Sequence, residues 1–271
     1  MSNILNLNTL WMEKRSRTPW GLPLGSGFEF WNQRARQLDT QRRWNQEITT
    51  RIITWLDLDP GCTVLDVGAG TGALCVPLSK VARHITAVEP SEEMRVFMGK
   101  YAQEEGATNI CCIGKPWEEV KPFEDVDQHD VVVASHSLVM EDLKAALAKM
   151  DQLANRSVHL ITSAVDEHGS YQELRKSLHC GEDRGGLDYI YPYNILYEMG
   201  IYADVEIWDV EYRRSFASLD NAVKLWASNL GASSPTDDEV IRSYLSRRIV
   251  EEDGSYLLNS RDKWALISWT P

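Results

Sequence analysis

The chain has few cysteines and no long apolar run, and each of these absences excludes a class of protein. Its five cysteines among 271 residues are an odd number and form no Cys-x-x-Cys pair, so a disulfide framework is not expected. No apolar run approaches the roughly 20 residues of a membrane-spanning helix. The first residues also lack the charged-then-apolar pattern of a secretion leader. We therefore expect a soluble protein of the cytoplasm.

Basic residues are in the minority as well, with 28 Lys and Arg against 40 Asp and Glu, a net charge of −12. This negative charge repels phosphate backbones and anionic lipids, so we expect neither a nucleic acid nor a membrane as partner. No metal site is expected, because the adjacent Cys111 and Cys112 point to opposite faces of a predicted strand. A small molecule is the expected partner, and a homodimer is compatible with the sequence.

Strand-like runs alternate with helical segments along most of the chain. This alternation, with several runs that are apolar throughout, predicts an α/β fold: a Rossmann-like, mostly parallel sheet with helices on both faces. The seven strand candidates lie at 63–67, 84–88, 109–113, 131–134, 158–162, 205–210 and 264–269.

We divide the chain into two parts. Residues 1–56 form an N-terminal helical extension, with two helices expected within 28–56, which we interpret as a lid. Residues 57–271 form the main domain. This domain carries an insertion after the fifth strand, at about 165–193, and a charged helical pair at about 218–252.

The most informative segment is the glycine cluster after the first predicted strand. Gly68, Ala69, Gly70 and Gly72 lie between that strand and a predicted helix. Glycines there permit a tight turn and close approach of a ligand, and the helix N-terminus offers unpaired N–H groups. A nucleotide-like cofactor is therefore expected across the turn. The glycines alone do not choose its class, because Gly68, Gly70 and Ala73 also fit the dinucleotide pattern.

Two carboxylates refine the choice of cofactor. Asp66 lies two residues before Gly68, where its charge opposes a pyrophosphate and attracts an ammonium or sulfonium group. Glu89 ends the second predicted strand, where a carboxylate can accept both hydroxyls of a ribose. The ribose contact suits a nicotinamide dinucleotide equally well, but Asp66 favours a cationic cofactor.

At these positions the chain resembles the class I S-adenosylmethionine-dependent methyltransferases. Three ordered motifs carry the resemblance, at 65–72, 87–94 and 129–138, and it covers about 54–199. The resemblance implies a seven-stranded sheet whose last strand runs antiparallel. It also implies S-adenosyl-L-methionine as cofactor and S-adenosyl-L-homocysteine as product.

The resemblance further implies which residues touch the cofactor. They are Asp66, Gly68, Ala69, Gly70 and Gly72 at the methionine part and the turn, Glu89 and Pro90 at the ribose, Met94, Trp117 and Glu118 at the adenine, and Ser135 and His136 beside the sulfonium. One departure concerns the third strand, where many relatives carry an acid directly after the glycine. Here Gly114 is followed by Lys115 and Pro116, which leaves the contact with the adenine amino group open, with Glu118 as the candidate.

Methyl transfer from a sulfonium is an in-line displacement that needs positioning but no nucleophilic side chain. An acceptor atom that starts protonated needs a general base as well. The candidates are His136, His168 and His179, because imidazole titrates near neutral pH. We interpret His168 and His179 as solvated loop residues, and keep cofactor-loop structure and chemistry as two interpretations of His136.

Acceptor recognition is expected from the parts added to the sheet, since ligands of open α/β folds lie outside the carboxyl ends of the strands. The aromatic candidates are Trp20 and Trp31 in the N-terminal part and Tyr189 and Tyr193 in the insertion, with simple packing as the alternative. The sequence thus predicts methyl transfer to a small-molecule acceptor. The alternatives are an NAD(P)-dependent oxidoreductase and a protein that binds the cofactor without turnover.

Overall fold

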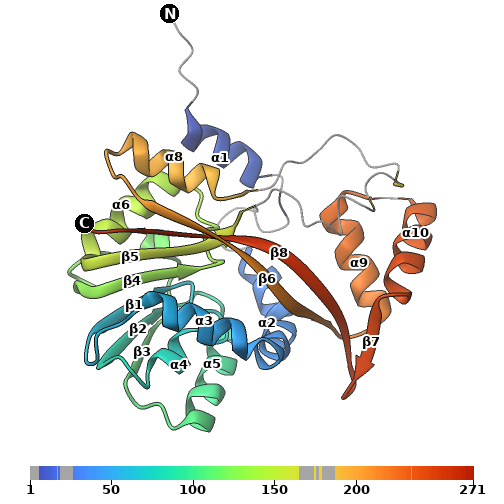
Figure 1. Cartoon of the computed structure of the whole chain (residues 1–271), viewed down its shortest axis with the longest axis horizontal. Helices are drawn as coiled ribbons and strands as arrows, with labels where there is room; N and C mark the ends of the chain where they lie inside the picture. Colours follow the sequence, from blue (N-terminus) through green and yellow to red (C-terminus); the bar gives the residue numbers. More distant parts are fainter. Residues whose placement is uncertain are drawn as a thin grey trace, which may run out of the picture.

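The computed structural model describes residues 6–16, 18, 27–164, 174, 177–178, 187–232 and 234–271. In these residues one sheet has helices on both faces, and a long hairpin carries a smaller helical module (Figure 1). The strands are β1 (Thr63–Val67), β2 (His84–Val88), β3 (Ile110–Ile113), β4 (His129–Ser135), β5 (Ala154–Ser163), β6 (Asp204–Phe216), β7 (Ile249–Glu252) and β8 (Ser255–Trp269). The helices are α1 (Leu7–Arg15), α2 (Gly27–Trp44), α3 (Gln46–Leu56), α4 (Cys75–Leu78), α5 (Glu92–Glu105), the short η1 (Trp117–Glu119), α6 (Leu143–Leu153), α8 (Ile190–Glu198), α9 (Leu219–Leu230) and α10 (Pro235–Ser246).

The strands follow the order β3-β2-β1-β4-β5-β8-β6. The pairs from β3 to β5 are parallel, whereas β8 runs antiparallel to β5, β6 and β7. This confirms the predicted Rossmann-like, mostly parallel sheet with an antiparallel last strand. The order reverses between β1 and β4, and in open α/β sheets such a reversal opens a crevice at the carboxyl ends of the strands.

Two apolar clusters cover the two faces of the sheet. On one face α1, α6 and α8 pack over side chains that include Val132, and on the other α3, α4 and α5 pack over side chains that include Val133. Consecutive residues of a strand point to opposite faces, so a strand covered on both sides must be apolar throughout. Residues 131–134 of β4 are accordingly all buried.

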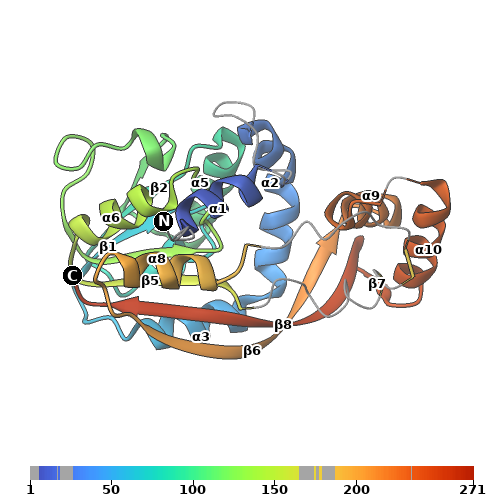
Figure 2. The same ribbon diagram turned by 90° about the horizontal axis from the view of Figure 1, so that it is seen from above.

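The described residues before 57 form three helices, one more than predicted. The extra helix, α1, is short, and its one buried side chain is Trp11, whose indole Nε1 donates to the carbonyl of Met140 at 2.8 Å. Helix α3 contributes Ile52 and Leu56 to the core under the sheet. Both views show α2 standing between the sheet and the α9–α10 pair (Figures 1 and 2). The division at residue 56 and the lid stay predictions.

The hairpin of β6 and β8 extends beyond the rest of the sheet. Strand β5 ends where Ser163 pairs with Trp264, whereas β6 and β8 continue pairing as far as Phe216 and Tyr256. This overhang carries β7, which pairs with β8, and the helices α9 and α10, which lie apart from the rest of the sheet in Figure 2. A third apolar cluster, which includes Trp226 and Ile241, holds this module together. We call α9, α10, β7 and the far end of the hairpin the satellite.

The prediction of a charged helical pair at about 218–252 is wrong at its end, because Ile249–Glu252 is the strand β7, paired with β8. The two residues that join these strands, Asp253 and Gly254, have φ values of 48° and 70°. Two consecutive positive φ values are what a tight two-residue hairpin turn requires, and Asp-Gly is a frequent sequence for it. The Asp253-Gly254 dipeptide is therefore the sequence feature that indicates the turn between β7 and β8.

The insertion expected at 165–193 lies largely outside the described residues. Of its described part, Leu174 and Leu178 pack into the core of the satellite, and α8 begins at Ile190. No helix in the described ranges is both long and apolar enough to cross a bilayer.

Candidate functional site

The glycine turn begins where β1 ends, and its shape depends on Gly68. The backbone N–H groups of Gly68 and Ala69 donate to the carbonyl of Val88, at 2.8 and 3.1 Å, which holds the turn against the end of β2. Gly68 has a φ of 76°, and a Cβ placed on it would lie 2.3 Å from the Cβ of Ser137. Only glycine fits this position, because any side chain would collide with the loop after β4.

The next glycines connect the turn to β2 and to α5. The N–H of Gly70 donates to Oε2 of Glu89 at 2.8 Å, so the turn and the second carboxylate are in direct contact. A Cβ on Gly72 would lie 2.9 Å from side-chain atoms of both Met98 and Val76. A Cβ on Gly70, in contrast, would meet just one side-chain atom of the described residues within 4 Å, the sulfur of Met94 at an ordinary 3.8 Å. The space above Gly70 is therefore the open part of the turn.

Asp66 and Glu89 are both buried beneath this turn, at 2% and 5% exposure. Burial, followed by repulsion from Glu89, raises the pKa of Asp66 from its usual value to about 7. Burial also raises the pKa of Glu89, although the N–H groups of Ser91 and Gly70 oppose this shift. Oδ2 of Asp66 has no hydrogen-bond partner among the described residues. Two acidic groups in one buried place favour a ligand that brings positive charge or hydrogen-bond donors.

The segment after β2 is shaped by Ser91, which is the N-cap of α5. Its hydroxyl accepts the N–H of Met94 at 3.2 Å, and its own N–H donates to Oε1 of Glu89 at 2.8 Å. Pro90 lies between Glu89 and this cap, and its carbonyl accepts from Arg95 at 2.7 Å. Met94 is buried beside the turn. Glu89 and Pro90, predicted at the ribose, and Met94, predicted at the adenine, thus lie together after the end of β2.

The loop after β4 forms the other side of the turn. The hydroxyl of Ser137 donates to the carbonyl of Val67 at 2.5 Å, and the N–H of His136 donates to that of Ile161 at 2.8 Å. His136 follows Ser135 with a φ of 51°, which is unusual for a residue other than glycine. Its exposed ring meets the ring of Trp264 edge to face, 4.3 Å between centroids. This places His136 between the glycine turn and the hairpin.

Trp117 and Glu118 make contacts that support α6. The indole of Trp117 is buried, and its Nε1 donates to the carbonyl of Ala146 at 3.2 Å. Nζ of Lys149 donates to the carbonyl of Trp117 at 2.7 Å. Glu118 accepts the N–H of Glu141 at 3.3 Å through Oε1. The predicted contact of these residues with adenine stays a prediction.

The predicted acceptor residues come from different parts of the fold. Trp31 lies on α2, half-buried, with its ring 5.0 Å from that of Phe30. Tyr189 and Tyr193 pack against the cluster beneath α8, and the N–H of Tyr189 donates to the carbonyl of Ser163 at 2.9 Å. The other candidates, Trp20, His168 and His179, lie outside the described residues.

Sequence reasoning missed a group of polar side chains on the hairpin. The phenol of Tyr212 donates to Oδ2 of Asp262, and Nε of Arg214 donates to the Tyr212 oxygen at 2.9 Å. Burial is the main cause that raises the pKa of Tyr212 well above its usual range. No local sequence pattern predicts this cluster, because Asp262 is 50 residues from Tyr212 and the two meet only through strand pairing.

This polar cluster lies just past the carboxyl end of β5. Along one face of β8 the side chains run from Leu266 and Trp264 to Asp262 and Ser260 and then to Leu258. The first two belong to the core under the sheet, and Leu258 belongs to the satellite core. The polar cluster therefore occupies the junction between the two cores, with Tyr212 6.0 Å from the ring of Trp264.

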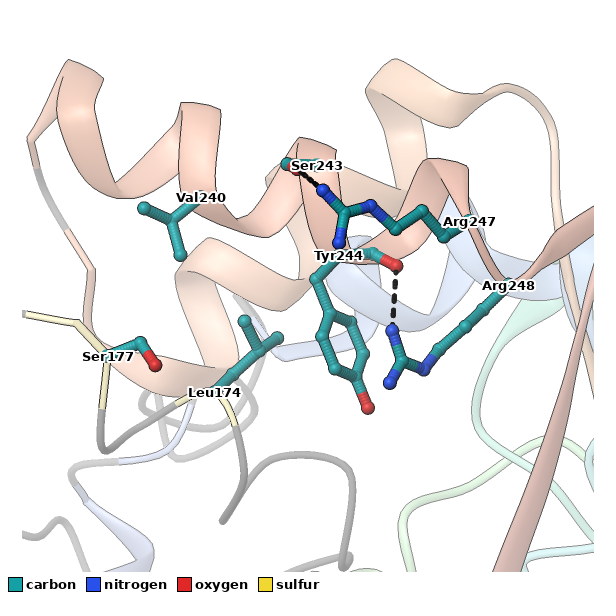
Figure 3. Close-up of a pocket in the computed structure, with 7 residues that line it drawn as sticks. All are labelled: Leu174, Ser177, Val240, Ser243, Tyr244, Arg247 and Arg248. Carbon is teal, nitrogen blue, oxygen red and sulfur yellow. Dashed lines mark hydrogen bonds between the residues drawn. The ribbon is translucent and has the colours of Figure 1, made fainter.

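A separate surface pocket of about 330 Å³ lies on the satellite, away from the glycine turn (Figure 3). Tyr244 and the guanidinium groups of Arg247 and Arg248 lie at one side of it, and Leu174 and Val240 at the other. Nitrogen atoms of the two arginines donate to Ser243 and to the carbonyl of Tyr244, at 3.3 and 3.4 Å. The pocket shares no residue with the predicted cofactor site.

Comparisons with known proteins agree with this geometry. Residues 64–157 match a protein-family profile described as Methyltransferase domain. The match begins in β1 and ends in β5, so it contains the glycine turn, both buried carboxylates and the loop after β4.

One relative and two solved structures extend this comparison. An uncharacterized protein of Haemophilus influenzae is 28% identical over 214 residues, which is 76% of this chain and 75% of that protein. The structure of the YcgJ protein of Bacillus subtilis is similar with a TM-score of 0.55 and 16% identity, covering 82% of this chain and 97% of that one. Magnesium protoporphyrin IX methyltransferase of Synechocystis, solved with bound SAH, has a TM-score of 0.51 and 16% identity, covering 83% of each chain. These structural likenesses show the fold.

Within the described ranges, no three side chains of His, Cys, Asp or Glu converge as a metal site would require. Cys111 and Cys112 lie on the edge strand β3, both exposed, and their thiols are free. Cys180, beside His179, is outside the described residues.

Proposed function

We propose that this protein transfers a methyl group from S-adenosyl-L-methionine to a small-molecule acceptor by in-line displacement. The observation that carries the proposal is the pair of buried carboxylates at the glycine turn, of which Asp66 leaves Oδ2 without a partner among the described residues. The methyltransferase profile covers this turn, and a structurally similar methyltransferase was solved with SAH.

The residues present suit such a cofactor. The cofactor brings a sulfonium, an ammonium group and ribose hydroxyls, and the site offers two carboxylates with capacity to accept. Each oxygen of Glu89 already accepts one backbone N–H, which fixes its orientation and leaves a lone pair on each for a ribose hydroxyl. The opening above Gly70, bordered by the sulfur of Met94, is where an adenosine can approach the backbone.

When bound, the cofactor supplies an activated methyl group on a positively charged sulfur. The chain would hold the ribose through Glu89 and the methionine part through the turn that Asp66 underlies. Ser135 and His136 would border the methyl group, because the loop after β4 closes the turn through Ser137. Holding donor and acceptor in line contributes up to about 7–11 kcal/mol in favourable cases.

We infer that the acceptor lies between His136 and the hairpin. The crevice of an open α/β sheet lies beyond its carboxyl strand ends, and here the polar cluster of Tyr212, Arg214 and Asp262 projects past them. Hydrogen-bonding groups at this junction favour an acceptor with polar substituents over a wholly apolar one. His136 is the candidate base for an acceptor that must lose a proton.

Isothermal titration with S-adenosylhomocysteine, and in parallel with NAD⁺ and NADP⁺, tests the cofactor. We expect binding of S-adenosylhomocysteine alone; binding of a nicotinamide dinucleotide alone would support the oxidoreductase instead. Glu89→Gln keeps the shape of the side chain but removes the charge and one acceptor, and should weaken binding by about 1–3 kcal/mol. Gln152→Ala, at the exposed end of α6, is the matched control and should leave binding unchanged.

Turnover separates an enzyme from a protein that only binds. Incubation with methyl-labelled S-adenosylmethionine and a broad panel of polar metabolites should label an acceptor. Normal cofactor binding with no labelled product across the panel would favour a binding protein over an enzyme.

A further inference from the structure

The hydroxyl of Ser91 has a second partner, and it comes from a distant part of the chain. Besides capping α5, this hydroxyl donates to Oδ1 of Asn32 on α2 at 2.6 Å. Ser91 is 1% exposed, so its hydroxyl depends on protein partners. A single residue thus joins α2, the start of α5 and the carboxylate of Glu89.

The face of α2 that meets α5 explains how Asn32 reaches this position. Asn32, Ala35, Asp39 and Arg42 follow one another at spacings of three, four and three residues, which places them on one side of a helix. Ala35 is buried, and its small side chain permits close packing. At the far end, the guanidinium of Arg42 lies 3.4 Å from the ring centroid of Tyr101 on α5.

Further contacts fix α2 in place. Arg42 forms a buried ion pair with Asp39 at 2.6 Å, within the same face. Directly after α2, at its junction with α3, Asn45 accepts the N–H of Arg213 on β6 at 2.8 Å and donates to its carbonyl at 2.9 Å. Gln37 donates to the carbonyl of Ser215 at 2.7 Å. Helix α2 therefore connects the start of α5 with the strand at the opposite edge of the sheet.

Ser91 is the link between Asn32 and the predicted cofactor residues. Without the acceptor on Asn32, the Ser91 hydroxyl can adopt another rotamer and release the N–H of Met94. The backbone N–H of the same residue holds Glu89, so a shift of Ser91 also reaches this carboxylate. Glu89 and Met94 are the residues proposed to hold the ribose and to flank the adenine. Groups that orient a ligand-binding side chain affect affinity without touching the ligand themselves.

We propose that Asn32 is a positioning residue of the cofactor site, through which the N-terminal helix α2 holds the ribose-binding segment ready for the adenosine. This inference rests on the proposed function. It makes α2 a fixed wall of the cofactor site at this point, and it assigns the N-terminal part a contribution to cofactor affinity.

The test compares three variants for unfolding temperature and for the dissociation constant of S-adenosylhomocysteine. Asn32→Leu keeps the size of the side chain and removes the acceptor, and should raise the dissociation constant roughly 3- to 10-fold. Asn32→Asp keeps an acceptor for the Ser91 hydroxyl and should restore affinity to near that of the parent. Asn45→Leu, which removes the contact of the α2–α3 junction with Arg213 of β6 instead, should lower the unfolding temperature but keep the dissociation constant within about twofold.

Two results would overturn this inference and leave the proposed function intact. In the first, the parent binds normally and Asn32→Leu lowers the unfolding temperature without changing the dissociation constant. In the second, Asn45→Leu weakens binding as much as Asn32→Leu does, which would mean that general loosening of α2 explains the loss. A parent protein that does not bind S-adenosylhomocysteine at all would overturn the proposed function, and this inference with it.

Discussion

The half of the sheet that carries the glycine turn and the half that carries the hairpin are built from contacts of different range. In the first, Asp66, Gly70, Glu89 and Ser91 lie within 26 positions of one another and meet through two neighbouring strands. In the second, Tyr212 and Asp262 are 50 residues apart and meet through one long antiparallel pair. The first half matches a family profile along 64–157, and the match stops before the second begins.

This difference suggests that the first half serves the cofactor and the second half serves the acceptor. A shared cofactor needs a shared turn, whereas an acceptor differs from one methyltransferase to the next and can be recognised by parts added to the same sheet. The satellite has its own apolar core, separate from the two cores of the sheet. If the two halves are independent, damage to one should leave the other intact.

The largest effect is expected from a cavity in the satellite core. Trp226 is 1% exposed, and Trp226→Ala should destabilise the satellite by about 3–5 kcal/mol. Hydrogen exchange should become faster in α9 and α10 but not in β1 or β2, and the affinity for S-adenosylhomocysteine should not change. Leu147→Ala, in α6 beneath the sheet, is the matched control and should speed exchange in β4 and β5 instead. Loss of cofactor affinity in Trp226→Ala would contradict the independence of the two halves.

A smaller loss of stability is expected at the glycine turn. Two substitutions there distinguish a steric clash of the new Cβ from backbone strain at a positive φ. Gly68→Ala places a Cβ 2.3 Å from Ser137 and should cost about 2–4 kcal/mol in urea unfolding, with loss of cofactor binding. Gly70→Ala meets only Met94 at 3.8 Å, so the positive φ of 57° is its main penalty, about 1–2 kcal/mol. Equal effects of the two substitutions would argue against the packing of the turn on the loop after β4.

The smallest effect concerns the dependence of stability on pH. The pKa of Asp66 is raised to about 7 by burial and by Glu89, whereas in the unfolded chain it is near 3.8. Between these values the folded state holds the proton that the unfolded state has lost, so stability falls as pH rises from about 4 to 7. Asp66→Asn removes this contribution.

We therefore expect the unfolding temperature of Asp66→Asn, relative to the parent, to increase as the pH is raised from 5 to 8. The difference should be on the order of 2 kcal/mol, or about 4–8 °C. The same comparison with Gln152→Ala, an exposed substitution that removes no titratable group, should show no such trend. An unfolding difference independent of pH would mean that Asp66 is ionised throughout this range.

The sequence predicted what depends on local chemistry. Asp66, the glycines and Glu89 could be located because a tight turn restricts φ and because strand ends of a parallel sheet meet at one edge. Ser91 could be recognised as an N-cap for the same local reason. The fold class followed from the alternation of strands and helices, and the parallel pairing from β3 to β5 confirmed it.

What escaped the sequence depends on partners far along the chain. The segment 259–263 of β8 has no apolar alternation, and it is held as a strand by its pairing with 209–213 of β6. Helix α1 is too short to be stable alone and depends on the bond from Trp11 to Met140. The contact between Asn32 and Ser91 spans 59 positions and leaves no trace in either local pattern.

A crystal structure of the protein with S-adenosylhomocysteine tests the central claim most directly. We predict that the ribose hydroxyls lie within about 2.6–3.2 Å of the Glu89 carboxylate, above Gly70. A ligand bound elsewhere in the crevice, with the carboxylate of Glu89 touching no part of it, would contradict the account.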